Sequence, residues 1–376
     1  MNTEDEKKQE RKDHRKRNRL RNKRKVHRLV HEVLGRFLDS LKQQMHVGIC
    51  KDDCHLTDVV ELRDLYQRHT TLDTRFSIDW NSFPADADPV TRIGILKKTA
   101  KARGQRKRKQ IESIYDVLRS HALLDVDSEK RQTIVDFGCG TGNLILALAH
   151  LFPEHDFVGV DLKETSIRLL NERIDKAQLT NVRTKLSLIE NFDEEFDIGL
   201  ALHVCGNATD AVLSICVEKN KSFICVPCCV GKIQVNRHCS LDDMRKRLSP
   251  SADQDTVGEV DMVSEEGETS PETTRDTLRY PRSALMRSIC DENTFMSVAK
   301  LADWSGNQEV SAYEDSSDAI LPTQAKEAVE IDRAQRCKEE GYEGSISLIK
   351  LHDCGLRNDL ILGVIDLGKS DDCIRL

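Results

Sequence analysis

Apolar residues in the first part of this chain recur at helical spacing. From position 26 to position 41 they are three or four residues apart, which predicts an amphipathic helix with a single apolar stripe. The stripe consists of Val26, Leu29, Val30, Val33, Leu34, Phe37, Leu38 and Leu41. We expect this stripe to pack on the main domain rather than to bind a membrane.

Further along the chain, short apolar runs alternate with helical patterns. Strands are predicted to start near Thr133, Phe157, Val182, Ile198 and Phe223. Helices are predicted between them, and a lead-in helix is predicted over 111–118. A helix at about 322–340 precedes two late strands, at 345–351 and 360–365. Alternating strands and helices predict an α/β fold, in which helices cover both faces of a largely parallel sheet.

The length of 376 residues suits one large α/β domain with appendages. Five segments are predicted: a basic extension with the amphipathic helix (1–45), a helical or irregular region (46–105), the first part of the domain (106–248), an insertion (249–277) and the second part (278–376). The insertion has nine acids, one arginine and almost no large apolar residue. Such a segment cannot bury a core, so a disordered acidic insertion is expected.

The net charge of −7 conceals two strongly basic segments. Residues 11–28 include eleven Lys or Arg and one acid, and residues 97–109 form a second basic run. Such segments supply counter-charge for an RNA backbone and predict salt-dependent binding. A basic run is also typical of a nuclear localisation signal or of a solvated tail. RNA is the partner that we expect, through both segments.

The start of the chain is charged and has no apolar core typical of a signal peptide, and no stretch of about 18 apolar residues occurs. We therefore expect a protein of the cytoplasm or nucleus, neither secreted nor membrane-bound. The thirteen cysteines are then thiols or metal ligands rather than disulfides. One candidate metal cluster, at His46, Cys50, Cys54 and His55, matches no standard zinc-finger spacing.

The richest chemical motif follows the predicted strand at 133–135. It reads Asp-Phe-Gly-Cys-Gly-Thr-Gly over 136–142 and leads into the helical pattern at 143–149. A strand, a glycine turn and a helix place free backbone amides beside a nucleotide-like ligand. Glycine permits positive φ and lets the backbone approach the ligand closely. The candidate cofactor-binding residues in this loop are Asp136, Gly138, Cys139, Gly140 and Gly142.

The spacing of the glycines distinguishes between cofactors. A dinucleotide-binding loop needs a third glycine where this chain has Asn143. The observed D-x-G-x-G-x-G pattern resembles motif I of the class I S-adenosylmethionine (SAM) methyltransferases. Asp161, at the tip of the next strand, can accept both ribose hydroxyls of an adenosyl group. Glu190 is the acid nearest to the position that reads adenine in that fold, and we include it in the cofactor site.

Two further motifs follow the next two strands. One includes His203 and Cys205, and the other includes Cys228 and Cys229. Because ligands of doubly wound sheets lie beyond the carboxyl ends of the strands, these four side chains are expected to meet near the transferred methyl group. Cys216 and Cys225 are expected to be small buried apolar residues.

Three mechanisms could use this cluster. His203 could orient or deprotonate the acceptor, with Asp197 supporting its strand. Cys228 could add to a pyrimidine ring as a nucleophile. Alternatively, His203 and the cysteines could bind zinc, although adjacent cysteines rarely both point at one ion. We favour His203 as the catalytic group, with Asp197 and Cys228 as further candidates, and assign no metal. Zinc at Cys205, Cys228 and Cys229 is the less favoured alternative.

The sequence A-L-H-x-C-G-x-x-T-D over 201–210, followed by P-C-C-x-G over 227–231, resembles a eukaryotic methyltransferase-domain family. Its members include the methyltransferase portion of glutathione S-transferase C-terminal domain-containing proteins and tRNA 2′-O-methyltransferase-like proteins. The resemblance covers about 106–367 and includes Tyr-Pro-Arg-Ser at 280–283, whereas residues 1–100 lack any glutathione transferase-like segment.

The resemblance implies a doubly wound, seven-stranded Rossmann-like sheet, SAM as cofactor, and methyl transfer to RNA (tRNA or rRNA). A protein methyltransferase and a non-catalytic RNA-binding scaffold remain alternatives. The scaffold would keep the fold after losing transfer.

Overall fold

The computed structural model describes residues 3–48, 62–65, 67–68, 76–91, 98–124, 130–234, 278–303, 316–351 and 359–365. The predicted acidic insertion at 249–277 lies outside these ranges. So do Cys50, Cys54 and His55 and the side chain of His46, so the predicted metal cluster there is untested. No helix in the described ranges is both long enough and apolar enough to cross a membrane.

The core of the fold is one sheet in the order β1-β7-β8-β6-β5-β2-β3-β4. The strands are β1 (Gln67–Arg68), β2 (Thr133–Phe137), β3 (Asp156–Asp161), β4 (Val182–Leu186), β5 (Ile198–Leu202), β6 (Ser222–Val226), β7 (Ser345–Lys350) and β8 (Asp359–Val364). β8 is antiparallel to both of its neighbours, and the other pairings are parallel. The seven predicted strands are confirmed. The eighth, β1, has two residues, too few to produce a periodic pattern.

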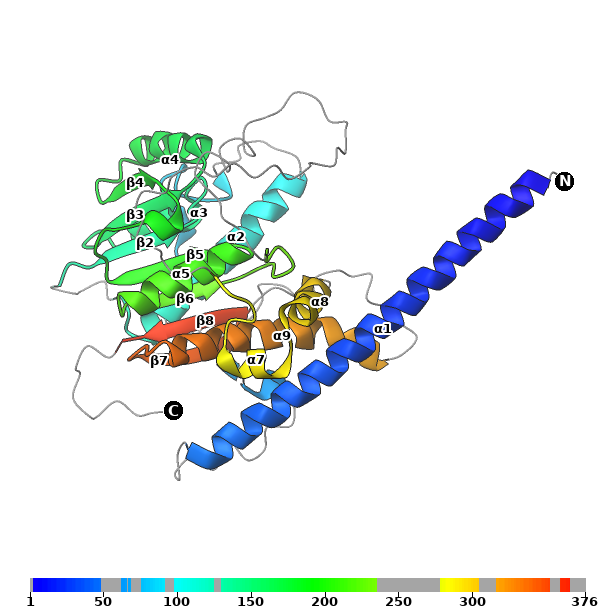
Figure 1. Cartoon of the computed structure of the whole chain (residues 1–376). Helices are drawn as coiled ribbons and strands as arrows, with labels where there is room; N and C mark the ends of the chain where they lie inside the picture. The colour runs from blue at the N-terminus through cyan, green and yellow to red at the C-terminus, as the bar shows by residue number, and fades with distance from the viewer. Residues whose placement is uncertain are drawn as a thin grey trace, which may run out of the picture.

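Helices flank this sheet (Figure 1). They are α1 (Thr3–Gly48), α2 (Lys98–Ser120), α3 (Asn143–Leu151), α4 (Glu164–Ala177), α5 (Asn207–Glu218), α7 (Ala284–Ile289), α8 (Glu292–Ala302) and α9 (Ser316–Glu339), with short 3₁₀ turns η2 (Leu62–Leu65), η4 (Trp80–Ser82) and η6 (Ile189–Asn191). The sequence did not predict α7 and α8. The segment boundary predicted at 105/106 falls inside α2, so it does not separate two structural units.

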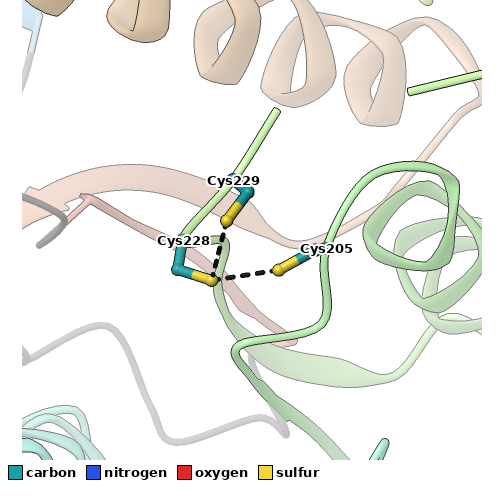
Figure 2. A group of neighbouring side chains, drawn as sticks. All are labelled: Cys205, Cys228 and Cys229. Atoms are coloured by element: carbon teal, nitrogen blue, oxygen red, sulfur yellow. Dashed lines mark hydrogen bonds between the residues drawn. The ribbon is translucent and has the colours of Figure 1, made fainter. Parts of the chain in front are cut away.

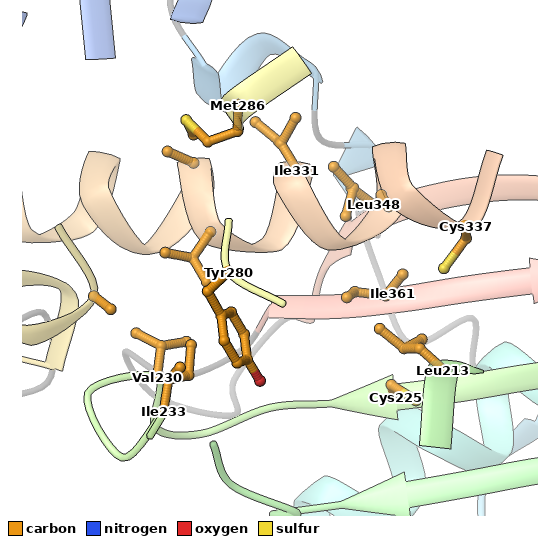
Figure 3. Packing of buried hydrophobic residues seen from close by; sticks show 14 of the residues in the cluster. Leu213, Cys225, Val230, Ile233, Tyr280, Met286, Ile331, Cys337, Leu348 and Ile361 are labelled. Atoms are coloured by element: carbon orange, nitrogen blue, oxygen red, sulfur yellow. The ribbon is translucent and has the colours of Figure 1, made fainter. Parts of the chain in front are cut away.

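Alternating residues of the central strands face two different cores. Ile134 packs with residues of α2, α3 and α4, whereas its neighbour Val135 packs with residues of α5 and α9. This alternation follows from the two-residue period of a strand. On the second face, Figure 3 shows Met286 of α7 on one side of α9 and Ile361 of β8 on the other. The sheet therefore has helices on both faces, as expected.

The long helix α1 has two different halves. In its second half, Val30 and Phe37 are fully buried and belong to the same core as α7, α8 and α9. Val26 and Leu29, at the start of the predicted stripe, remain more than a third exposed. The first half projects away from the body of the molecule (Figure 1). The predicted packing of the stripe on the domain is confirmed from Val30 onward.

A buried ionic network fixes α9 against the start of α5. The guanidinium of Arg333 donates from Nη2 to Asp210 Oδ2 (2.9 Å) and from Nη1 to Glu330 Oε2 (3.0 Å). The hydroxyl of Tyr280 donates to Asp210 Oδ2 (2.8 Å), and Asp332 accepts the backbone amides of residues 282 and 283. The Thr-Asp and Tyr-Pro-Arg-Ser motifs of the sequence are therefore partners in one structural network.

Candidate active site

The glycine loop between β2 and α3 has the backbone that its sequence predicts. Gly138, Gly140 and Gly142 have φ values of +69°, +55° and +82°. A Cβ on Gly142 would lie 2.3 Å from Leu170 Cδ1, and one on Gly138 would lie 2.8 Å from Val204 Cγ2. A Cβ on Gly140 would meet no atom within 4 Å. The outer glycines are thus needed for packing, and the middle one borders open space.

Asp161 ends β3 beside this loop. Its Oδ2 accepts the amide of Gly140 (2.9 Å), and its Oδ1 accepts the amide of Lys163 (2.8 Å). The carboxylate therefore links the glycine loop to the start of α4. It also lines the large cavity at this edge of the sheet, as the sequence predicts for an acid that meets a ribose.

Asp136 and Cys139 have more internal positions than predicted. Asp136 is 3% exposed and is not a lining residue of the cavity; its carboxylate accepts the amide of Ile145 in α3. Burial, followed by the charge of Asp161, raises the pKa of Asp136 to about 8. The Cys139 side chain is 8% exposed, and burial raises its pKa as well. Both residues shape the loop from inside instead of facing the cavity.

The raised pKa of Asp136 predicts a pH-dependent stability. The folded protein keeps this carboxyl protonated up to about pH 8, whereas the unfolded chain ionises near 3.8. The contribution of the protonated Asp136 to the free energy of unfolding is complete below pH 3.8 and is lost as the pH rises through about 8. As the pH rises from 5 to 7, the free energy of unfolding of the wild type should therefore fall by about 2–3 kcal/mol more than that of Asp136→Asn, which has no carboxyl at this position. Urea unfolding at the two pH values measures this, and equal pH dependence in both proteins would contradict it.

The cavity at the carboxyl edge of the sheet has a volume of about 1730 Å³. At one end it is lined by Gly138, Asp161 and Glu190, and from there it passes His203 and Cys205. It then continues along α5 to a group of basic and acidic side chains: Lys232, Arg279, Arg282, Arg287 and Arg336 with Glu218, Glu292 and Glu340. Glu190, in η6, is exposed at the cavity wall, where it was predicted. One cavity thus joins the predicted cofactor loop to the predicted catalytic residue.

His203 is held in an unusual conformation at the end of β5. Its φ is +63°, a left-handed value that is uncommon for a residue with a Cβ. Its amide donates to Val226 O (3.2 Å), and its Nε2 lies 3.1 Å from Oε1 of Gln110 in α2. Because an amide oxygen only accepts, Nε2 is the donor of this contact when the Gln110 amide turns Oε1 toward the ring. Gln110 was missed from the sequence, where 93 residues separate it from His203.

Three cysteines gather where the loops after β5 and β6 meet (Figure 2). The Sγ of Cys228 lies 3.0 Å from that of Cys205 and 3.5 Å from that of Cys229. The predicted approach of these cysteines is confirmed. Within the described ranges, the group of mutually close ligand atoms consists of these three thiols, and the imidazole of His203 is outside it. Cys216 and Cys225 are fully buried, as expected.

The protonation of the cluster does not favour Cys228 as a nucleophile. The hydrogen bond with Cys228, aided by Cys229 and the charge of Lys232 and opposed by burial, lowers the pKa of Cys205 to about 6. The same bond, together with burial, raises the pKa of Cys228. The thiolate of the pair is therefore on Cys205. Cys228 is also not a lining residue of the cavity. Both observations argue against the predicted attack of Cys228 on a pyrimidine ring, which stays a prediction.

Asp197 lies at the opposite edge of the sheet from His203. It immediately precedes β5, and its Oδ2 accepts the backbone amide of Thr133 at the start of β2 (2.8 Å). His203 follows the other end of β5. With about 3.3 Å per residue, the six steps from Asp197 to His203 separate the two positions by roughly 20 Å. Asp197 secures the start of its strand, so its inclusion among the catalytic residues is wrong.

Residues 106–236 match a family model described as a methyltransferase domain. This segment is a methyltransferase domain. It contains the glycine loop, Asp161, His203 and the three cysteines. The doubly wound sheet around it, in which β8 lies antiparallel between β6 and β7, has the class I arrangement of SAM-dependent enzymes.

Curated relatives extend the match beyond the methyltransferase domain. The human glutathione S-transferase C-terminal domain-containing protein is 25% identical over 289 residues, which are 77% of this chain and 37% of that protein. Its Drosophila melanogaster homolog is 26% identical over 263 residues, 70% of this chain and 37% of that protein. The chain thus spans little more than a third of these relatives.

Two other matches are more local. A tRNA (guanine-N(7)-)-methyltransferase from Dictyostelium discoideum is 42% identical over 55 residues, 15% of this chain and 20% of that protein. The solved magnesium protoporphyrin IX methyltransferase of Synechocystis, with bound SAH, is 15% identical and overlaps 35% of this chain and 60% of its own, with a TM-score of 0.30. So partial an overlap supports no structural argument.

The residues of the methyltransferase domain fit SAM. Gly140 borders open space where a side chain would otherwise stand, and Asp161 presents a carboxylate at the tip of β3. Residues 187–191 line the adjoining wall, where Leu188 and Ile189 would offer apolar surface to an adenine ring. Glu190, beside them, would be the acceptor for the adenine amine. SAM, when bound there, supplies a methyl group that is already activated by its sulfonium.

Proposed function

We propose that this chain is a SAM-dependent methyltransferase whose acceptor is RNA. The observation that carries the RNA assignment is that the basic helix α2 leads directly to the catalytic candidate. Arg103, Arg106 and Lys107 are exposed, and their spacing places them on the same helix face as Gln110. Because Gln110 contacts His203, this basic face ends at the cavity.

Helix stability does not account for the charge on α2. Its first turn has no acidic residue and instead includes Lys98 and Lys101. The positive end of a helix dipole disfavours cations. Basic side chains at that end therefore cost stability unless an anion binds there. A phosphate backbone that passes along α2 would supply such anions.

Helix α1 adds a second basic surface. Arg15, Arg17, Arg21 and Arg24 are exposed on its projecting half (Figure 1). By contrast, the cavity itself balances five basic side chains against Asp161, Glu190 and three further glutamates, so it offers no strong field for a polyanion. The proposal therefore assigns the RNA backbone to the helices and the reacting nucleotide to the cavity. The name of the Dictyostelium relative, which specifies tRNA, agrees with this over a short stretch.

In this proposal His203 prepares the acceptor. With Gln110 accepting from Nε2, Nδ1 would be the ring nitrogen that acts as the base. Nδ1 can orient a ribose hydroxyl or base nitrogen, or accept its proton as the methyl is transferred. Since the methyl is already activated, alignment by these residues supplies much of the acceleration.

The test of the activity is transfer of labelled methyl from SAM to an extract that lacks the endogenous protein. The product is divided and treated with RNase or with protease. We expect label that RNase releases, and that is absent with His203→Ala when SAM binding is intact. Label released by protease would replace RNA by protein as the acceptor. SAM binding without transfer to either fraction would favour the scaffold alternative.

The route along α2 is tested by charge reversal. Arg103→Glu/Arg106→Glu should lower the affinity for the labelled RNA by at least about tenfold and reduce the slope of log affinity against log salt by about one to two. SAM affinity should stay unchanged. Arg168→Glu/Lys176→Glu, on exposed positions of α4, makes the same change in net charge elsewhere. Equal losses in the two double variants would contradict a specific path along α2.

A further inference from the structure

The three-cysteine cluster has the geometry of a metal site. The three Sγ atoms all lie within 4.8 Å of one another, and two of the separations are 3.0 and 3.5 Å. Three thiolates bound to one tetrahedral zinc at about 2.3 Å would be about 3.8 Å apart. The separations of Cys228 Sγ from Cys205 Sγ (3.0 Å) and from Cys229 Sγ (3.5 Å) are both shorter than that value. Lengthening each of them by less than 1 Å would produce the spacing of such a site.

The backbone around the cluster is already fixed. The amide of Gly206 donates to Cys229 O (3.2 Å), which joins the loop of Cys205 to the loop of Cys228 and Cys229. Farther along the second loop, the amide of Val230 donates to Asp303 Oδ1 (2.8 Å). A Cβ on Gly206 would lie 2.7 Å from Lys232 O, so the two loops meet more closely than another residue would allow. Such support from outside the ligands is typical of metal sites.

Adjacent cysteines seldom bind one ion, but here the backbone turns both toward the same point. Cys228 and Cys229 follow the end of β6, and Figure 2 shows the sulfur of Cys228 between those of Cys205 and Cys229, in contact with both. All three side chains are partly buried, as the ligands of a shielded ion should be. Cys205 also lines the cavity, so a fourth ligand can arrive from that side.

We propose that Cys205, Cys228 and Cys229 form a thiolate site for one zinc-type divalent cation. On binding, the thiol protons leave to solvent and three sulfur–metal bonds form, with no change of oxidation state. With a neutral fourth ligand the site carries one negative charge, which the neighbouring Lys232 compensates. Catalytic zinc sites, unlike structural ones, have three protein ligands and a fourth position that is open to solvent or substrate. The cavity beside Cys205 would provide such an open position. The site does not depend on the proposed methyl transfer.

A disulfide is the competing outcome for the same sulfurs. It would join Cys205 to Cys228, leave Cys229 unused, and require their separation to shorten from 3.0 Å to about 2.05 Å. The metal uses all three thiols, including Cys229, which a single disulfide does not explain. The two outcomes differ in their response to reductant, since a disulfide is lost under reducing conditions and a metal–thiolate site is not.

The experiment uses the full chain, purified under reducing conditions with added zinc and then desalted. Elemental analysis should find one zinc per chain, and titration of the metal-free protein with Co²⁺ should produce thiolate-to-cobalt charge-transfer absorption. Cys205→Ser and Cys229→Ser should each lose both signals. The control Cys290→Ser should keep them, because Cys290 lies outside the cluster and burial raises its pKa to about 12.

Circular dichroism of each metal-free variant separates loss of the ligand from loss of the fold. Absence of zinc and of cobalt absorption in the folded wild type would overturn the proposal. Zinc retained by Cys205→Ser and Cys229→Ser would also overturn it, by placing the ion elsewhere in the chain. A reductant-sensitive Cys205–Cys228 disulfide that blocks Co²⁺ binding, with no metal taken up after reduction, would establish the disulfide instead.

Discussion

Replacing the buried Arg333 with methionine is expected to lower the free energy of unfolding by about 3–5 kcal/mol. Arg333 is 1% exposed, and its guanidinium binds Asp210 through Nε (3.1 Å) and Nη2 (2.9 Å). It also donates to Glu330 and to the carbonyl of Gly206. Methionine fills most of the space but removes a buried cation from two carboxylates, and these keep only the longer ion pairs of Asp210 with Arg282 (3.5 Å) and of Glu330 with Lys326 (3.3 Å). Weakening two buried charge pairs is costlier than the loss of one contact.

Thermal unfolding followed by circular dichroism measures this effect, with an expected fall in Tm on the order of 10 °C. The matched control is Arg168→Met, because Arg168 forms an exposed ion pair with Glu172 on α4 and such pairs contribute little. The Tm of Arg333→Lys should lie between those of the wild type and Arg333→Met, since lysine keeps the charge but loses the paired donors of the guanidinium. A decrease for Arg333→Met no larger than that of the control would show that the network contributes no stability.

The parts of the site that were predicted correctly depend on short segments of sequence. Gly138, Gly140 and Gly142 adopt positive φ within one turn, and Asp161 comes directly after an apolar strand. Both features are local, so the residue pattern specifies them. Strand direction is local as well. Asp197 precedes its strand and therefore had to lie at the opposite edge from His203, a consequence of order that the sequence alone could have supplied.

Other parts of the site depend on contacts between distant segments. Gln110 reaches His203 across 93 positions, and Asp210 meets Arg333 across 123. In the sequence, Asp210 is simply an acid in the first turn of a helix, where any acid is favourable. The convergence of Cys228 and Cys229 has a similar origin. It results from how the loop after β6 is tied to the loop after β5, and neighbouring cysteines in a sequence do not specify that geometry.

Asp161→Asn is expected to weaken SAM binding by about 100-fold while the protein stays folded. A carboxylate that accepts two ribose hydroxyls loses its charge in this variant, and hydrogen bonds to a charged group contribute about 1.5–3 kcal/mol each. The amide oxygen of asparagine can still accept one of the two backbone amides, of Gly140 or of Lys163, that the carboxylate now binds. Asparagine therefore isolates the ligand contacts better than alanine, which would release both loops.

Isothermal titration of SAM measures the change, and the same strand provides the control. Asp156→Asn is the identical substitution at the other end of β3, where the carboxylate pairs with Arg131 on the surface. It should bind SAM like the wild type. Unchanged SAM affinity in Asp161→Asn would remove the carboxylate from the ribose site. A second readout comes from Asp136, whose pKa is raised partly by Asp161. Because Asp161→Asn deletes that charge, the stability lost between pH 5 and pH 7 should become smaller, even without SAM.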